Sequence, residues 1–352
     1  MRLFRFLPLL LGSLFLVQHT PASLRYAYAD SVILSAIHDS LIPGAVLCVV
    51  DNQEIVYLQA YGHRRVVPVH EAMTPHTIFD LASVSKPLGA GTAMLMLCAD
   101  GKASVDDYVS QYIENYHSDV QIRHLMTHYS GLPAYMNATR LDSIFSSRTI
   151  PPHLYPHYMI DTIARCYRPS KVGEKYCYSC LNFISLQGVV ESIVGVDINR
   201  YLRSTLYSDL GVSMGWLPDS AILEKIAPTE CQDTCCLHGQ VHDPLARVLM
   251  KGISGNAGIF ATAEEVAKWA IWFMQLSQDV REKGCNAGLW TDTVVTSVGE
   301  QPRYRHTGYT GTSVTIMPQS GRALVLLTNR VHPRDVHSLG DLRRKLNEWL
   351  IP

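Results

Sequence analysis

Short runs of β-branched and other apolar residues near both ends of the chain predict strands. Val46–Val50 and Ile55–Ala60 are separated by a short polar stretch, a pattern typical of a β-hairpin. Ser313–Met317 and Ala323–Thr328 form a second such pair around a turn that contains Pro318. We therefore expect strands from both ends of the chain to join in one antiparallel sheet.

Longer apolar segments between and after these strand pairs predict helices. Leu88–Ala99 is apolar throughout and is followed by Gly101, which predicts a buried helix. Leu181–Val194 carries apolar residues at helical spacing and stops at Gly195, and Val336–Leu350 repeats that spacing at the end of the chain. Strands at both ends with helices between them predict an α+β fold with flanking helices and an inserted helical subdomain.

The first thirty residues have the pattern of an export signal. Arg2 and Arg5 precede the apolar run Phe6–Val17, which is too short to span a bilayer comfortably. Ala27-Tyr28-Ala29 then offers a cleavage site between small residues. We expect residues 1–29 to be a signal peptide and the protein to be exported to the periplasm or another extracytoplasmic space. An uncleaved segment that tethers the protein to a membrane is the alternative.

Composition and charge narrow the class of protein further. The chain has 352 residues, of which 47% are hydrophobic, so it can bury a large core. Its formal net charge of −1, with both signs dispersed, predicts no nucleic-acid partner. We expect one domain at 30–352, with a sheet part at about 30–82 and 255–352 and a helical part at about 83–254.

Nine cysteines are an odd number for an exported chain. Cys48 and Cys98 lie in apolar runs, which is typical of buried thiols. Three more cysteines and two histidines lie close together in the sequence: Cys231, Cys235, Cys236, His238 and His242. Their spacing fits no closed zinc pattern, so disulfides or unpaired thiols are the simpler interpretation, with a metal site as the alternative. We predict no metal and no cofactor.

Three short motifs carry candidate chemistry, and they occur in a telling order. Ser83-Val84-Ser85-Lys86 places a hydroxyl and an amine three residues apart, on one face of a helix. Tyr178-Ser179-Cys180 adds a phenol that can relay protons, and His306-Thr307-Gly308 suits a strand edge beside a reacting carbonyl. The parts are those of a serine nucleophile with its base.

Pro87 sharpens the position of the nucleophile. A proline inside a helix disrupts the hydrogen bond to the carbonyl four residues earlier, which here belongs to Ser83. The helix should therefore begin near Ser83, so its hydroxyl lies at the positively polarised helix end. Lys86 serves as a base only if burial or nearby positive charge makes its ammonium acidic, and the apolar segment that follows predicts burial.

With their flanking residues, these motifs resemble those of the penicillin-binding-protein-like serine hydrolases, the family of class C β-lactamases, D,D-peptidases and related esterases. The resemblance runs from about Ile42 to about Pro333 and rests on five stretches: Phe79–Pro87, His124–Pro133, Gly173–Ser179, Gly255–Phe260 and His306–Thr312. It implies a β-lactamase/transpeptidase-like fold and an acyl-enzyme on Ser83, with Lys86 and Tyr178 moving protons. It also implies an oxyanion hole made by the backbone N–H groups of Ser83 and Tyr309, and substrate contacts from four residues: Cys180, His306, Thr307 and Gly308.

Two residues depart from the family pattern. Cys180 stands where members that act on β-lactams or peptidoglycan stems usually carry asparagine, and a thiol is a weak donor and acceptor. His306 replaces the commoner lysine, so turnover of carboxylate-bearing substrates should improve below about pH 6.5 if His306 contacts them. Arg303 and Arg305 are another source of charge, although on a strand they alternate away from His306.

Other segments are less specific. His242-Asp243-Pro244 either lines the cleft or forms a structural turn, and Gly255–Gly258 has the composition of a tight turn that leads into a strand. Cys177 and Cys180 have the spacing of a redox pair, but they lie inside the tyrosine motif, so thiol–disulfide catalysis is disfavoured.

The sequence therefore predicts an exported serine hydrolase that acts on peptidoglycan-derived peptides or D-amino-acid amides. A carboxylesterase is the first alternative, favoured by the cysteine at position 180, and a β-lactamase is the second. A catalytically inactive envelope-binding protein is a third, but Ser83, Lys86 and Tyr178 are all present. The expected partner is a small molecule or a peptidoglycan fragment.

Overall fold

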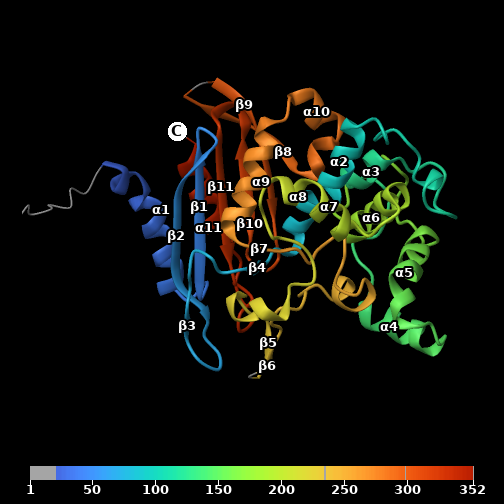
Figure 1. Ribbon diagram of the computed structural model, residues 1–352, viewed down its shortest axis with the longest axis horizontal. Coiled ribbons are helices and arrows are strands. Elements are labelled where there is room, and N and C mark those ends of the chain that lie inside the picture. The colour runs from blue at the N-terminus through green and yellow to red at the C-terminus, as the bar shows by residue number, and fades with distance from the viewer. Residues whose placement is uncertain (1–20, 234, 298, 352) are drawn as a thin grey trace, which may run out of the picture.

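A seven-stranded antiparallel sheet organises the molecule (Figure 1), and its strands follow the order β3-β2-β1-β11-β10-β9-β8. The computed structural model describes residues 21–233, 235–297 and 299–351. The strands are β1 (Gly44–Asp51), β2 (Glu54–Arg65), β3 (Glu71–Ala72), β8 (Trp290–Thr296), β9 (Gly299–Thr307), β10 (Ser313–Met317) and β11 (Arg322–Thr328). β1 pairs with β11 from Ala45↔Thr328 to Val50↔Ala323, so the two ends of the chain meet at the centre of the sheet, as predicted.

Helices cover both faces of this sheet. Residues of β1 alternate between two apolar layers, because successive side chains of a strand point to opposite faces. Val46 and Cys48 join the layer that contains α9 (Ala263–Gln275), whereas Ala45 and Leu47 join the layer of α1 (Pro21–His38) and α11 (Gly340–Leu350). Burial on both sides explains why β1 has no polar alternation.

The remaining helices gather at one side of the sheet (Figure 1). They are α2 (Thr92–Ala99), α3 (Ile122–Met126), α4 (Ala138–Ser147), α5 (Tyr155–Ala164), α6 (Cys180–Val194), α7 (Ile198–Ser204), α8 (Leu206–Asp209) and α10 (Gln278–Lys283). Helices α2 to α8 all fall within residues 83–254. Two short two-stranded pieces lie beside this sheet in the described residues: β4 (Phe79–Asp80) with β7 (Phe260–Ala261), and β5 (Cys231–Gln232) with β6 (Cys235–Cys236).

The predicted helices form, with local differences. The segment predicted at Leu181–Val194 is α6, which ends at Gly195 with a left-handed φ of 72°. The segment predicted at Leu88–Ala99 begins instead with a π-helical turn over Pro87–Gly91, and only its second half is α-helical. The proline has no N–H to donate, and the wider turn lets the Thr92 hydroxyl donate to its carbonyl at 2.6 Å. The last predicted helix starts later, at Gly340.

The predicted leader lies mostly outside the described residues, but the predicted cut before Asp30 falls within α1. Ala29 is fully buried, and the Tyr26 ring stacks on Tyr57 at 4.2 Å. The Asp30 carboxylate accepts hydrogen bonds from the hydroxyls of Tyr57 and Tyr61, each at 2.6 Å. A cut at this position would divide a packed helix, and the cleavage site stays a prediction.

Among the described residues, no single helix has the length and apolarity needed to cross a membrane. A bent pair, Cys180–Val194 with Ile198–Asp209, meets the requirement by length and composition only, with 62° between its halves.

Candidate active site

Ser83 lies where a short strand turns into a helix. It sits in a 3-10 turn over Ala82–Val84, directly after β4 and Leu81, and the helical run through Pro87 follows at once. The helix therefore begins where the proline predicted. Ala82 holds a left-handed φ of 46°, a conformation that costs energy for a residue with a side chain and sharpens the turn at the nucleophile.

The Lys86 amine faces the nucleophile, as the three-residue spacing predicts. Its Nζ donates to Ser83 Oγ at 2.9 Å and to the backbone carbonyl of Asn256 at 2.9 Å. The Cys180 sulfur lies 3.7 Å from the same nitrogen. The hydroxyl and its partner amine are thus in direct contact before any substrate binds.

Lys86 is completely buried, as expected, but its ammonium is not made acidic. Burial lowers the pKa of Lys86, whereas the ionised forms of Cys180 and Tyr178 raise it, and the net pKa lies above the ordinary lysine value. The condition set for Lys86 as a simple base, an acidic ammonium, is therefore not met in the resting site. Lys86 rests as an ammonium, and any base must arise from its coupling to the neighbouring groups.

Tyr178 is held in place by packing and by the cap of α6. Its ring lies 4.5 Å from the His128 ring and 5.8 Å from Trp290, measured between centroids. The next residue, Ser179, caps α6 by accepting a hydrogen bond from Leu181 N–H, and its own N–H donates to His128 Nδ1 at 3.2 Å. The Lys86 Nζ lies 5.0 Å from the Tyr178 ring centroid, so phenol and ammonium are neighbours.

His306 is a neutral, buried residue. Its ring stacks on Trp290 at 4.5 Å, and its Nδ1 donates to the Thr307 carbonyl at 3.0 Å. Burial, with help from the positive charge of Lys86, holds the pKa of His306 well below its usual value. The expected gain in turnover below about pH 6.5 required His306 to contact the substrate and gain a charge; its full burial and lowered pKa argue against both, and the pH dependence stays a prediction.

The neighbouring arginines do not replace the missing lysine charge. Arg303 and Arg305 both pair with Asp292 of β8, at 2.6 Å and 3.2 Å. Alternation along β9 places them on the face opposite His306, as predicted from strand geometry. A cation that faces the pocket must come from elsewhere in the chain.

The third motif packs directly against the nucleophile turn. The hydroxyls of Thr310 and Thr312, on the turn between β9 and β10, donate to the carbonyls of Asp80 and Leu81 at 2.7 Å and 2.8 Å. The pocket that results is lined by Ser83, Tyr178, Thr307, Gly308 and Tyr309, among others. Both predicted oxyanion donors therefore belong to residues that line one pocket, although their role as donors stays a prediction.

The predicted substrate-binding residues divide into two groups. Thr307 and Gly308 line the pocket. His306 is fully buried and stacks on the Trp290 ring, and the Cys180 sulfur lies beside the Lys86 amine. Both residues therefore contact residues of the site without being among those that line the pocket. The pocket wall also includes residues that the sequence did not single out: Trp290, Arg330, Asp335 and Arg343.

A buried polar network supports Lys86 from behind, and the sequence only partly indicated it. The Asn256 side chain donates to Asp243 at 3.2 Å and accepts from the Ser254 hydroxyl at 2.6 Å, which fixes the carbonyl that Lys86 uses. Gly255–Gly258 is therefore more than an architectural turn.

Asp80 accepts from Ala82 N–H at 2.8 Å and from His242 N–H at 2.7 Å, and burial raises the pKa of its carboxyl.

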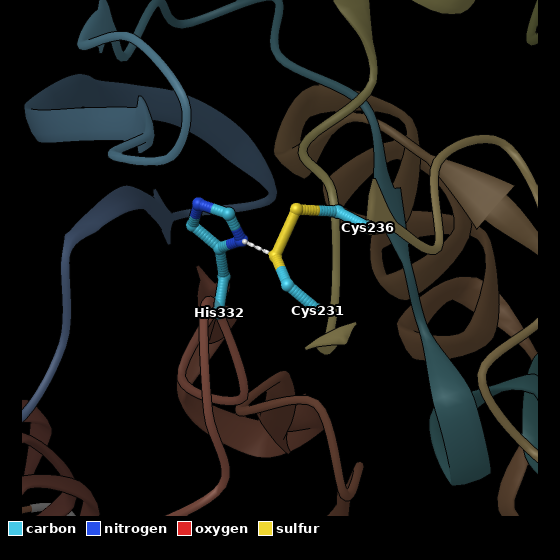
Figure 2. A group of neighbouring side chains, drawn as sticks. All are labelled: Cys231, Cys236 and His332. Carbon is cyan, nitrogen blue, oxygen red and sulfur yellow. Dashed lines mark hydrogen bonds between the residues drawn. A yellow bond between two sulfur atoms is a disulfide. The ribbon is translucent and has the colours of Figure 1, made fainter. Parts of the chain in front are cut away.

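The cysteine cluster forms a disulfide rather than an open ligand set (Figure 2). Cys231 and Cys236 are bonded across the β5–β6 hairpin, and His332 Nδ1 lies 3.3 Å from the Cys231 sulfur. His332 Nε2 accepts from Val66 N–H at 3.0 Å, so the ring proton lies on Nδ1, which has no free lone pair for a metal ion. The donor set therefore does not fit a metal while the disulfide is formed.

The other cysteines in the described residues are free thiols, including Cys177 and Cys180, which form no disulfide with each other. Cys48 is buried, as predicted, and burial raises the pKa of its thiol to about 12. Cys98 is only partly buried.

The chain is similar to known proteins over most of its length. The sequence model of the family described as Beta-lactamase matches residues 29–348. A protein named "Putative D-alanyl-D-alanine carboxypeptidase" from Escherichia coli O157:H7 is 26% identical over 359 residues, which cover 84% of this chain and 80% of that protein. The protein of the same name from Salmonella agona (strain SL483) is 28% identical over 361 residues, with the same coverage, 84% and 80%.

Solved structures share the fold at lower identity. A penicillin-binding protein homologue from Pyrococcus abyssi superposes with a TM-score of 0.70 at 18% identity, covering 88% of this chain and 74% of its own. The hydrolase EstCE1, described as having promiscuous acyltransferase activity, gives 0.69 at 18% identity, with 94% and 99% coverage. A class C β-lactamase gives 0.70 at 18% identity, with 95% and 97% coverage.

Proposed function

Since this chain belongs to the β-lactamase family, we propose that it hydrolyses peptidoglycan-derived peptides or D-amino-acid amides through an acyl-enzyme on Ser83. The observation that carries the proposal is the hydrogen bond of 2.9 Å between Lys86 Nζ and Ser83 Oγ, at a pocket that Tyr178 also lines. A serine hydroxyl becomes a useful nucleophile only with such a partner at hand.

The proton steps follow from the coupling of Lys86 and Tyr178. In the reactive form this pair carries one proton fewer than in the resting site, so it can accept a proton. As Ser83 Oγ attacks the substrate carbonyl carbon, the serine proton passes to this pair, which then gives it to the departing amine. Water releases the acyl group by the reverse sequence. The backbone N–H groups of Ser83 and Tyr309 hold the negative oxygen that forms at each attack.

Three further observations bear on the substrate and on location. The named relatives carry a D-alanyl-D-alanine carboxypeptidase name at 26% and 28% identity, over 84% of this chain. The export pattern of the first thirty residues would bring the enzyme to peptidoglycan. The cysteine at position 180, which replaces the asparagine expected for acylamide recognition, points to an acyl group other than that of a standard penicillin.

Carboxylesterase activity is the second candidate. The Cys180 sulfur contacts the Lys86 amine and offers a substrate amide only a weak donor or acceptor. An ester needs no acylamide grip, and the similar fold of EstCE1 belongs to a hydrolase. β-Lactamase activity ranks third. Rapid hydrolysis of a penicilloyl-enzyme needs a water molecule held in position, and we assign no residue of this pocket to that role.

Intact-protein mass spectrometry with benzylpenicillin tests the leading candidate. A penicilloyl-sized adduct on the wild type, absent from Ser83→Ala, would support Ser83 as the nucleophile and a site that accepts D-alanyl-D-alanine mimics. A D-alanyl-D-alanine peptide would then be the first substrate to assay. Absence of both adduct and penicillin turnover, together with hydrolysis of short-chain esters, would favour the esterase candidate. If Ser83 reacts with neither benzylpenicillin nor short-chain esters, the proposal is contradicted.

A further inference from the structure

Two arginines hold the backbone on either side of the Tyr309 amide. Arg343, in the first turn of α11, donates through one terminal nitrogen to the Gly308 carbonyl at 2.9 Å and to the Thr312 carbonyl at 3.0 Å. Arg330, which follows β11, donates through Nε at 3.0 Å and through a terminal nitrogen at 2.6 Å to the Tyr309 carbonyl. Both side chains line the same pocket as Ser83.

The Gly308 carbonyl and the Tyr309 N–H belong to one peptide group. A cation that hydrogen-bonds the carbonyl oxygen draws electron density through the amide, which makes the N–H on the other side a stronger donor. In the proposed reaction, this N–H is one of the two groups that face the oxyanion. A charged contact at the Gly308 oxygen therefore acts on catalysis without touching the substrate.

Arg343 has no carboxylate partner in the described part of the chain. None of the ion pairs between residues in the described part of the chain includes it, and its Nε is buried without a hydrogen-bond partner there. Burial and the nearby Arg330 lower the pKa of Arg343 to about 10, so it still carries its charge at neutral pH. Its cost of desolvation is balanced mainly by two backbone carbonyls rather than by an anion.

Arg330 fixes the next peptide group and the aromatic side chain. Its guanidinium lies 5.0 Å from the Tyr309 ring centroid and pairs with Asp335 at 2.6 Å. The Tyr309 hydroxyl also donates to Asp335, so the ring is held at both ends. Any movement of the Tyr309 ring or of the peptide that follows it must break this set of contacts.

We infer that Arg343 is a positioning residue that orients and polarises the Gly308–Tyr309 peptide as an oxyanion donor, with Arg330 holding the peptide that follows. This inference rests on the proposed function, because it requires an oxyanion at Ser83. A competing role is direct binding of a substrate carboxylate by Arg343, since its side chain lines the pocket. Ligands without a carboxylate separate the two roles.

The test uses 4-nitrophenyl butyrate as substrate and phenylboronic acid as a tetrahedral inhibitor that bonds to the serine. Arg343→Met should lower kcat about 10-fold or more while KM changes less than about two-fold, because only the transition state carries the oxyanion. The inhibition constant for phenylboronic acid should rise by a similar factor. Arg344→Met is the matched control, because the neighbouring Arg344 is exposed and pairs with Glu348 on the same helix.

Two further variants keep the test informative if Arg343→Met folds poorly. Arg343→Lys keeps a charge and Arg343→Gln keeps a neutral donor, so the inference expects weaker phenylboronic acid binding in the glutamine variant than in the lysine variant. Equal values, or a methionine variant that matches Arg344→Met in kcat, would overturn the inference. A loss confined to carboxylate-bearing substrates would also overturn it, in favour of direct anion binding.

The proposed function can fail separately from this inference. Wild-type protein that neither reacts with a fluorophosphonate at Ser83 nor hydrolyses the ester would contradict the serine-hydrolase mechanism itself, and the role of Arg343 would fall with it. If the wild type reacts with the fluorophosphonate and hydrolyses the ester, and the Arg343 variants keep wild-type kcat, the serine-hydrolase mechanism is supported and only the inference about Arg343 is contradicted.

Discussion

Gly308 lies against the carbonyl oxygen of Leu81, two residues before the nucleophile. A Cβ added at Gly308 would stand 2.4 Å from this oxygen and 2.1 Å from Thr312 Oγ1, and neither group has room to move. Both belong to the contacts that hold the third motif against the nucleophile turn. The absence of a side chain at position 308 therefore sets how close the Tyr309 amide comes to Ser83.

This contact predicts the effect of Gly308→Ala. The added methyl group must push the β9–β10 turn away from Leu81, so we expect kcat to fall about 100-fold, the usual effect of losing an oxyanion donor. Overpacking should also lower the free energy of unfolding by about 1–3 kcal/mol. Gly340→Ala is the control, because the nearest atom to its Cβ would be 3.8 Å away. Ester turnover and urea unfolding measure both effects, and an alanine variant with full activity would contradict this geometry.

Loss of the Lys86 amine should stop the chemistry rather than the folding. Lys86→Ala removes the partner of Ser83 Oγ and the positive charge beside the Tyr178 ring, so we expect kcat to drop about 1,000-fold. Stopped-flow measurement of 4-nitrophenol release by the wild type and by Lys86→Ala compares their acylation rates directly. Lys102→Ala serves as control, since Lys102 is exposed and pairs with Asp100 at the surface. Retention of more than a tenth of the activity would mean that another group is the base.

The low pKa of His306 makes a prediction about pH. A histidine that stays neutral gives no added attraction for a carboxylate between pH 5 and 8, so the wild type and His306→Gln should differ by a constant factor in kcat/KM over this range. The substrate is a carboxylate-bearing ester, assayed at half-unit steps. A ratio that grows below pH 6.5 would show that the histidine does become charged.

His128 links stability to pH. Burial lowers the pKa of His128 from 6.5 to about 3, so the unfolded chain binds a proton below pH 6.5 that the folded chain does not. Stability therefore falls as pH falls, by about 1.4 kcal/mol for each unit between these values. Urea unfolding of the wild type and His128→Asn between pH 4 and 7 measures this slope. The variant should start less stable and lose less on acidification, and parallel curves would refute the assignment.

The packing of α1 predicts which mature form is stable. A chain that begins at Asp30 lacks Tyr26, which is buried and stacks on Tyr57, so we expect it to lose about 2–4 kcal/mol relative to a chain that begins at Pro21. Denaturant midpoints of the two purified chains give the comparison. The mass of the protein isolated from cells then shows which form exists, and equal midpoints would mean that the first half of α1 contributes little.

Local pattern was enough to predict the parts of the site that lie close together in sequence. Ser83 and Lys86 are one turn apart, and Pro87 sets the start of their helix, so their contact follows from geometry that a short segment encodes. The strand pairs and α6 are local in the same sense. The sheet assembled from both chain ends also followed, because the apolar strand runs occur only there.

Features that depend on distant segments could not be read in this way. Trp290, Arg330 and Arg343 reach the pocket only because the sheet register and the docking of α11 bring them there. Asn256 acts through its backbone carbonyl, and a main-chain group leaves no signature in residue identity. The pKa values of Lys86 and His306 depend on burial and on neighbours from other elements, so residue identity alone could not give the direction of either shift.

Arg343 belongs to α11, the last helix in the described residues, which packs on one face of the sheet. Ser83 is synthesised well before Arg343. A growing or C-terminally truncated polypeptide therefore contains Ser83 but lacks one of the residues that line its pocket. The backbone contacts around Tyr309 are therefore complete only after a segment that is synthesised later than every motif residue has docked. Removal of α11 would take away the Arg343 contacts to Gly308 and Thr312 while leaving every motif residue in the chain.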